Sequence, residues 1–203
     1  MQCIGTADVV ESLAFAIKQQ QVISVRGGGH NVAGRAVCKN GVMIDLSLMK
    51  GMHVGVDTKT VTVQTSVTWC ELNRETQLHG LAIPGGMISS TGVAGLTLGG
   101  GLGALMPKYG LTIDNLISAE VVTVSGEALT ASAEQNRDLY WAIRGGGGNF
   151  GIITSFEFQL HPVGPIVEGG LIVYAENENR RNAQILLRAY DFNQHWVISA
   201  DGN

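Results

Sequence analysis

Three glycine-rich segments limit the folds that this chain can adopt. They are residues 26–31 (RGGGHN), 84–103 (PGGMISSTGVAGLTLGGGLG) and 144–151 (RGGGGNFG). Glycine supplies 28 of the 203 residues, about twice its share in an average protein. Because glycine is costly inside helices and strands, such clusters favour loops in which the backbone closely approaches another group. We therefore expect several glycine-rich loops to share one ligand.

Composition excludes several classes of protein. The glycines follow no fixed period, which excludes collagen, and a chain with 45% hydrophobic and 15% charged residues is not disordered. A net charge of −4 without a basic block predicts no nucleic-acid partner. No apolar run approaches the ~20 residues that a bilayer span needs, so we expect no membrane segment. No signal peptide is visible after Met1, which favours a cytoplasmic protein.

The cysteines predict neither a disulfide framework nor a metal site. Their number is odd, and none of them belongs to a CxxC or zinc-like pair. We expect buried or free thiols at Cys3, Cys38 and Cys70.

Hydrophobic periodicity predicts alternating helices and strands. Helical spacing indicates helices over 6–20 and 68–79 and a helix-like segment over 138–143. Trp69 and Trp141 lie on the apolar faces of these helices, so we expect both in the core. Alternating or β-branched runs predict strands over 22–25, 41–46, 52–56, 60–65, 119–124 and 152–160.

A boundary is expected at residues 161–165, with the sequence HPVGP. We place one domain at 1–163 and the beginning of a second at 164–203, with a strand over 166–175 and a helix over 177–190. That second unit is too short to close a core of its own.

The glycine segments allow more than one interpretation. Gly146–Gly151 and Gly99–Ala104 fit a dinucleotide-binding pattern, which requires a strand before it and a helix after it. Gly151 instead opens a strand, so we do not expect a Rossmann site. Backbone N–H groups of successive glycines also form nests that bind a diphosphate. Residues 26–31 fit such a nest, and a tight turn with a solvated Arg26 is the alternative.

His30 lies among glycines that offer no side chains to bury it, and Asn31 can orient it. Imidazole is a nucleophile that can form a covalent link to an electrophilic cofactor. A surface or hydrogen-bonded histidine is the alternative, and the residues themselves leave both open. The other histidines form no metal-binding pair, and we interpret them as structural: His53, His79, His161 and His195.

Four motifs, in this order along the chain, resemble the FAD-binding (PCMH-type) domain of the vanillyl-alcohol-oxidase-like flavoproteins. They are residues 25–31, 91–103, 108–115 and 144–152. The resemblance covers residues 3–163 and is nearest to the berberine-bridge-enzyme-like (BBE-like) and 6-hydroxy-D-nicotine-oxidase-like oxidases. It implies an α+β fold with two subdomains that hold FAD between them, followed by the start of a truncated substrate domain.

The resemblance also implies the residues of the site. His30 matches the histidine that these enzymes join to the flavin 8α-methyl carbon, which implies a single 8α-histidyl linkage. A cysteinyl linkage is not implied, because Ile88 stands where bicovalent members have cysteine, and Leu96 replaces a histidine of some plant members. The implied cofactor contacts are Arg26, Gly27, Gly28, Gly29, His30, Asn31, Gly85, Gly86, Ser90, Thr91, Gly92, Gly95, Gly99, Gly101, Val121, Gly151 and Ile152.

The function implied by the resemblance is that of an FAD-dependent oxidoreductase. Such an enzyme oxidises an alcohol or amine C–H by hydride transfer to flavin N5, and O2 reoxidises the flavin. The implied partners are a small-molecule substrate and O2, with the catalytic base expected beyond Asn203. The alternative is a catalytically silent FAD-binding module that lacks the substrate domain.

Overall fold

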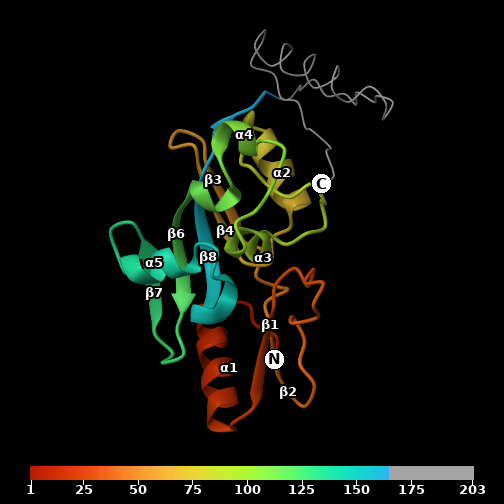
Figure 1. The fold of residues 1–203 in the computed structure, drawn as a ribbon, viewed down its shortest axis with the longest axis vertical. Coiled ribbons are helices and arrows are strands. Elements are labelled where there is room, and N and C mark those ends of the chain that lie inside the picture. Colours follow the sequence, from red (N-terminus) through yellow and green to blue (C-terminus); the bar gives the residue numbers. More distant parts are fainter. Residues whose placement is uncertain (165–203) are drawn as a thin grey trace, which may run out of the picture. The chain divides into compact units, whose positions relative to one another are not determined.

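The computed structural model describes residues 1–164 of the chain (Figure 1). The elements expected over 166–175 and 177–190, and His195, lie outside the described residues. The described part belongs to one compact unit, Met1–Pro165, and the domain boundary stays a prediction. Within residues 1–164, no helix has both the length and the apolar character needed to cross a membrane.

The N-terminal part of the unit packs one helix on two parallel strands. Helix α1 (Thr6–Lys18) leads to strand β1 (Val22–Arg26), which pairs in parallel with β2 (Gly41–Asp45). The Asp8 carboxylate accepts hydrogen bonds from the backbone N–H groups of Ile4 and Gly5 and so caps α1. One face of α1 is buried on a small core, which consists of Cys3, Val9, Leu13, Ile44, Leu46, Met49, Val122 and Ile152.

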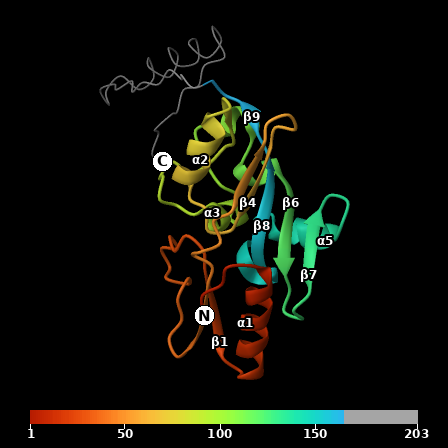
Figure 2. The same cartoon turned by 180° about the vertical axis from the view of Figure 1, so that it is seen from behind.

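A five-stranded sheet forms the second part of the unit (Figures 1 and 2). Its order is β3-β4-β8-β6-β7 and every neighbouring pair is antiparallel. The central strand β8 therefore bonds β4 on one side and β6 on the other. The strands are β3 (Met52–Gly55), β4 (Thr60–Gln64), β6 (Leu116–Val122), β7 (Ala128–Ser132) and β8 (Ile152–Gln159).

Short helices and turns cover this sheet around a second core. The core is centred on fully buried Trp69, Phe156 and Phe158. The covering elements are α2 (Trp69–Gln77), α3 (Val93–Leu98), α4 (Met106–Tyr109), α5 (Arg137–Ile143) and the 3₁₀ turns η1 (Thr112–Asn115) and η2 (Gly147–Phe150). Strands β5 (Leu81–Ala82) and β9 (His161–Pro162) form a separate antiparallel pair.

Helix α2 begins with a capping box. The Glu71 carboxylate accepts the Thr68 N–H at 2.8 Å, and the Thr68 hydroxyl accepts the Glu71 N–H at 3.5 Å. The Lys50 ammonium lies 2.6 Å from the same carboxylate. Burial alone would raise the pKa of Glu71, but Lys50 and the Thr68 bonds hold that pKa below its ordinary value. The charged carboxylate therefore stabilises the start of the helix.

The structure differs from the predictions made from the sequence at three places. The segment 84–103 was expected to be too glycine-rich for a good helix, yet its residues 93–98 form α3, because Val93, Ala94 and Leu98 are buried against the core. Trp141 was expected in the core but is 79% exposed, whereas Trp69 is buried as expected. Strand β7 was not predicted at all.

Candidate functional site

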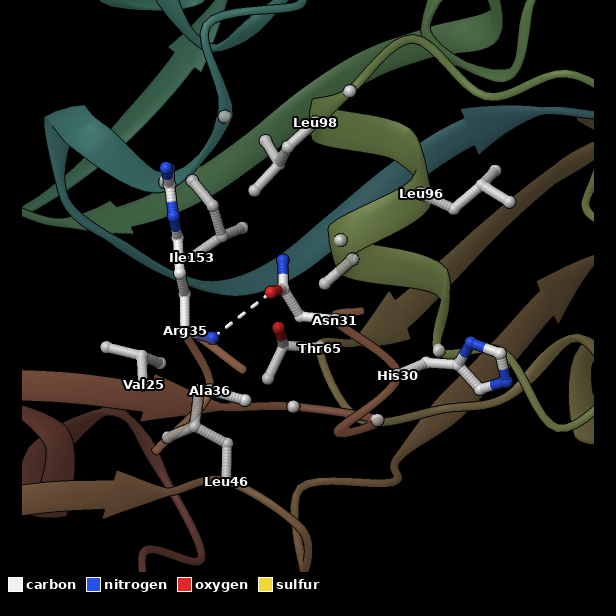
Figure 3. A pocket seen from close by; sticks show the side chains of 18 of the residues that line it. Val25, His30, Asn31, Arg35, Ala36, Leu46, Thr65, Leu96, Leu98 and Ile153 are labelled. Atoms are coloured by element: carbon white, nitrogen blue, oxygen red, sulfur yellow. Dashed lines mark hydrogen bonds between the residues drawn. The ribbon is translucent and has the colours of Figure 1, made fainter. Parts of the chain in front are cut away.

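A cavity of about 840 Å³ brings the three glycine-rich segments together. Its size falls in the range of small-molecule and cofactor sites. The lining comes from β1 and the loop after it, from α3 and the loop before it, and from the turn that leads into β8 (Figure 3). Of the residues implied by the resemblance, those on this cavity are Gly27, Gly28, Gly29, His30, Asn31, Thr91, Gly92, Gly95, Gly99, Gly151 and Ile152.

Two of the glycine segments cross in direct backbone contact. A Cβ atom placed on Gly28 would lie 2.6 Å from the Gly92 Cα atom, and one on Gly92 would lie 2.8 Å from the Gly28 Cα atom. No side chain fits at such distances, so both positions require glycine. The crossing joins the loop after β1 to the start of α3 and so fixes one wall of the cavity.

For two other glycines on the cavity, no contact within the described chain requires the absence of a side chain. A Cβ atom on Gly95 or on Gly148 would meet nothing within 4 Å among residues 1–164, and neither residue has a positive φ. Gly95 lies inside α3, where glycine costs about 1 kcal/mol relative to alanine. Both face space that a side chain would fill. The cavity therefore has room beside both residues for a large bound group such as FAD.

A buried hydroxyl on the cavity points to the same conclusion. Ser24, in the middle of β1, is 6% exposed and lines the cavity. Its Oγ atom is buried and has no hydrogen-bond partner among the described residues. An unsatisfied buried hydroxyl costs about 1–3 kcal/mol, so a polar group of a ligand would repay that cost.

The charge of the cavity comes from a residue that the sequence did not single out. Arg35 is the one permanently charged side chain among the described residues that line it, and no Asp or Glu is among them. Arg26, which the resemblance implied as a contact, lies off the cavity and pairs with Asp45 at 3.6 Å. The cavity is therefore electropositive at one place and otherwise offers backbone groups and apolar walls.

His30 and Arg35 lie well apart in the close view of the cavity (Figure 3). The His30 imidazole is exposed and lies beside the loop before α3. Asn31 was expected to orient His30. Its side-chain oxygen instead accepts a hydrogen bond from the backbone N–H of Arg35 at 3.1 Å. His30 is thus an exposed side chain on the cavity that Asn31 does not hold.

Six implied contacts lie off the cavity: Arg26, Gly85, Gly86, Ser90, Gly101 and Val121. For several of them the structure gives another reason. A Cβ atom on Gly85 would lie 2.4 Å from the Trp69 ring, and one on Gly101, where φ is +85°, would lie 2.3 Å from the Thr112 hydroxyl. Val121 is fully buried in the core. A cofactor role for these six residues stays a prediction.

The segment 144–151 was expected at the ligand, but the implied contacts left out most of the turn that closes the cavity. Gly145–Asn149 lines it, although only Gly151 and Ile152 were predicted from this segment. Arg144 holds the base of the turn: its guanidinium donates to the Ile113 carbonyl at 2.8 Å and lies 3.2 Å from the Asp114 carboxylate. The run of four glycines after Arg144 was the available signal.

A second polar cluster lies outside the cavity. The Tyr109 and His161 rings stack at 3.9 Å, and His161 Nε2 lies 2.5 Å from Asn115 Oδ1. Burial, followed by the charge of Lys108, lowers the pKa of His161 below its ordinary value. The cluster ties β9 to α4 and η1, which supports the structural reading of His161. Within residues 1–164, no group of three or more His, Cys, Asp or Glu side chains could hold a metal ion.

Comparison with known proteins decides what this fold is. The family model described as "FAD binding domain" matches residues 2–132. The chain belongs to this family. It is 42% identical over 165 residues to an FAD-linked oxidoreductase of Dictyostelium discoideum, covering 81% of the chain and 36% of that protein.

Solved flavoproteins share the fold of this FAD-binding chain. The 6-hydroxy-D-nicotine oxidase of Arthrobacter nicotinovorans matches with a TM-score of 0.78 and 38% identity over 79% of the chain and 36% of its own. A BBE-like protein of Arabidopsis thaliana matches with a TM-score of 0.76 and 36% identity over 81% of the chain and 35% of its own. The α+β, PCMH-type fold implied by the sequence is confirmed. The chain spans about a third of the length of these relatives.

Proposed function

We propose that the chain is the FAD-binding part of an FAD-dependent oxidase, with FAD held in the cavity of about 840 Å³. The observation that carries the proposal is the open space beside Gly95 and Gly148 on this cavity, in a chain that belongs to the FAD-binding-domain family. When bound, FAD supplies a hydride acceptor at N5 for an alcohol or amine C–H and is reoxidised by O2. The chain's own residues bind and orient it.

Each side of the cavity has a distinct part in this proposal. Backbone N–H groups of residues 27–29 and the Ser24 hydroxyl offer hydrogen bonds to polar atoms of the cofactor. Leu98 and Ile153 offer apolar surface to its rings. Accessible His30 is the attachment point for the 8α carbon and would provide a single covalent tether. The contacts to a small-molecule substrate, and the base that deprotonates it, would come from parts of the enzyme other than this cavity.

The tether is tested on denatured protein. The purified chain is unfolded in acid and SDS, separated on a gel, and viewed for flavin fluorescence. We expect a fluorescent band for the wild type and for the control His53→Ala, whose side chain is exposed on β3 away from the cavity. We expect a dark band for His30→Ala.

The other outcomes separate the parts of the proposal. A dark wild-type band with yellow supernatant would remove the tether and keep a non-covalent FAD site. Flavin that is bleached by dithionite, but by no alcohol, amine or sugar, would favour the catalytically silent module. Colourless protein after refolding with excess FAD would refute the proposal.

A further inference from the structure

We propose that Arg35 recognises the diphosphate of the bound dinucleotide and so makes the cavity selective for phosphorylated flavins over riboflavin. This inference rests on the proposed function, because it assigns one part of the same site. It adds a side chain to the diphosphate site that the sequence predicted only from the backbone nest of residues 26–31.

The charge of the cavity supports the inference first. A dinucleotide brings a negatively charged diphosphate, and Arg35 is the one permanent cation among the described lining residues. The four ion pairs among residues 1–164 do not include Arg35, whereas Arg26 already pairs with Asp45. Arg35 therefore has its charge available for a ligand. Its planar set of N–H donors matches phosphate oxygens well.

The position of Arg35 is fixed by the backbone of its own loop. The Asn31 side-chain oxygen accepts a hydrogen bond from the backbone N–H of Arg35 at 3.1 Å. The Asn31 backbone carbonyl accepts one from the backbone N–H of Gly34 at 3.0 Å. Gly34 has a φ of +71°, a conformation that glycine adopts without strain. A turn defined by side-chain and backbone bonds thus carries the arginine to the cavity.

The separation of His30 and Arg35 assigns them to different parts of the ligand. The two side chains leave the same short segment but lie at opposite sides of the close view (Figure 3). Arg35 extends past Ile153, next to the turn formed by residues 145–149. If His30 holds the flavin ring, Arg35 is placed for the phosphates beyond the ribityl chain and not for the ring. Loss of Arg35 should therefore affect phosphate-bearing ligands alone.

The test compares three probes by titration calorimetry on the full 203-residue chain. FAD and riboflavin are titrated in a His30→Ala background, so that binding stays non-covalent, and ADP is titrated with His30 present. We expect Arg35→Ala to weaken FAD and ADP by about 10- to 100-fold, as for loss of one charge-assisted hydrogen bond. Riboflavin affinity should stay within about twofold, because it has no phosphate.

Two further variants make the comparison sharper. Arg35→Lys keeps the charge but loses the planar donors, so it should lose less affinity than Arg35→Ala. Arg137→Ala removes an exposed arginine outside the cavity and serves as the control for net charge. In the His30→Ala background, the affinity for FAD should fall as salt rises, and this dependence should be weaker when Arg35→Ala is added.

Three results would overturn the inference. Equal weakening of FAD and riboflavin in Arg35→Ala would mean that Arg35 only supports the loop. Unchanged FAD and ADP affinities would mean that it does not touch the phosphates, although the FAD site itself would stand. If the chain with Arg35 intact binds neither FAD, in the His30→Ala background, nor ADP, the proposed function fails as well.

Discussion

The substitution Gly95→Ala should stabilise the chain when FAD is absent and lower its Tm when FAD is present. Gly95 is a residue of α3, and a Cβ atom there meets nothing within 4 Å in the described chain. Without ligand, alanine should therefore improve helix stability by up to about 1 kcal/mol. For a chain of this length that corresponds to a rise in Tm of about 2 to 4 °C.

Gly95 also lines the cavity, so the added methyl group would compete with a ligand for space there. All chains in this test carry His30→Ala, so that binding stays non-covalent. FAD at a hundred times its Kd then stabilises the chain in which Gly95 is unchanged by about 2.7 kcal/mol. A steric clash of about 1–3 kcal/mol would weaken FAD by up to about 100-fold. At the same FAD concentration the ligand then contributes only about 0.4 kcal/mol. With FAD, the variant should melt about 3 to 5 °C below the chain in which Gly95 is unchanged.

The assay is thermal unfolding, with and without FAD, of the His30→Ala chain alone and with Gly95→Ala or Gly5→Ala added. Gly5 also has open space around its Cβ position but lies outside the cavity. Its variant should show the same FAD-induced rise in Tm as the His30→Ala chain alone. Should Gly95→Ala gain as much from FAD as Gly5→Ala does, the ligand does not pass Gly95, and the explanation of that glycine is wrong.

Two further substitutions test the crossing and the polar cluster outside the cavity. Gly28→Ala places a methyl group 2.6 Å from the Gly92 backbone, so urea unfolding should show a loss of about 1–3 kcal/mol; unchanged stability would show that the crossing is looser than described. His161 has a lowered pKa in the folded chain, so the unfolded chain binds more protons below about pH 6.5 and stability should fall as the pH drops from 7 to 5.5. His161→Gln should flatten that fall in Tm while the exposed His79→Gln control retains it, and identical slopes for both variants would contradict the assignment.

Local patterns in the sequence predicted most of the elements around the site. Helical spacing located α1 and α2, and alternation located the β3–β4 hairpin, because each depends on residues close together in the chain. Helix α3 and strand β7 escaped prediction for a different reason. Their residues have weak propensities, and contacts with distant segments decide their structure.

The site was predictable as a set of segments but not residue by residue. The three glycine-rich segments do meet at one cavity. Sequence could not separate Gly85, which makes room for Trp69, from Gly95, which faces the cavity, because both are glycines in one run. The resemblance also implied Arg26, next to the glycines, and left Arg35 out. Only the fold shows that Asp45 neutralises Arg26.

The central position of β8 also determines when this unit can fold during synthesis. Strand β4 ends at Gln64, but its neighbour in the sheet is complete only at Gln159, 95 residues later. At about 5–20 residues per second, a ribosome needs roughly 5 to 20 s for that stretch. During this time one edge of the β3–β4 hairpin lacks its partner on the nascent chain. Because residues 145–153 complete the cavity in the same interval, a finished cavity is open to a ligand only after these residues have emerged.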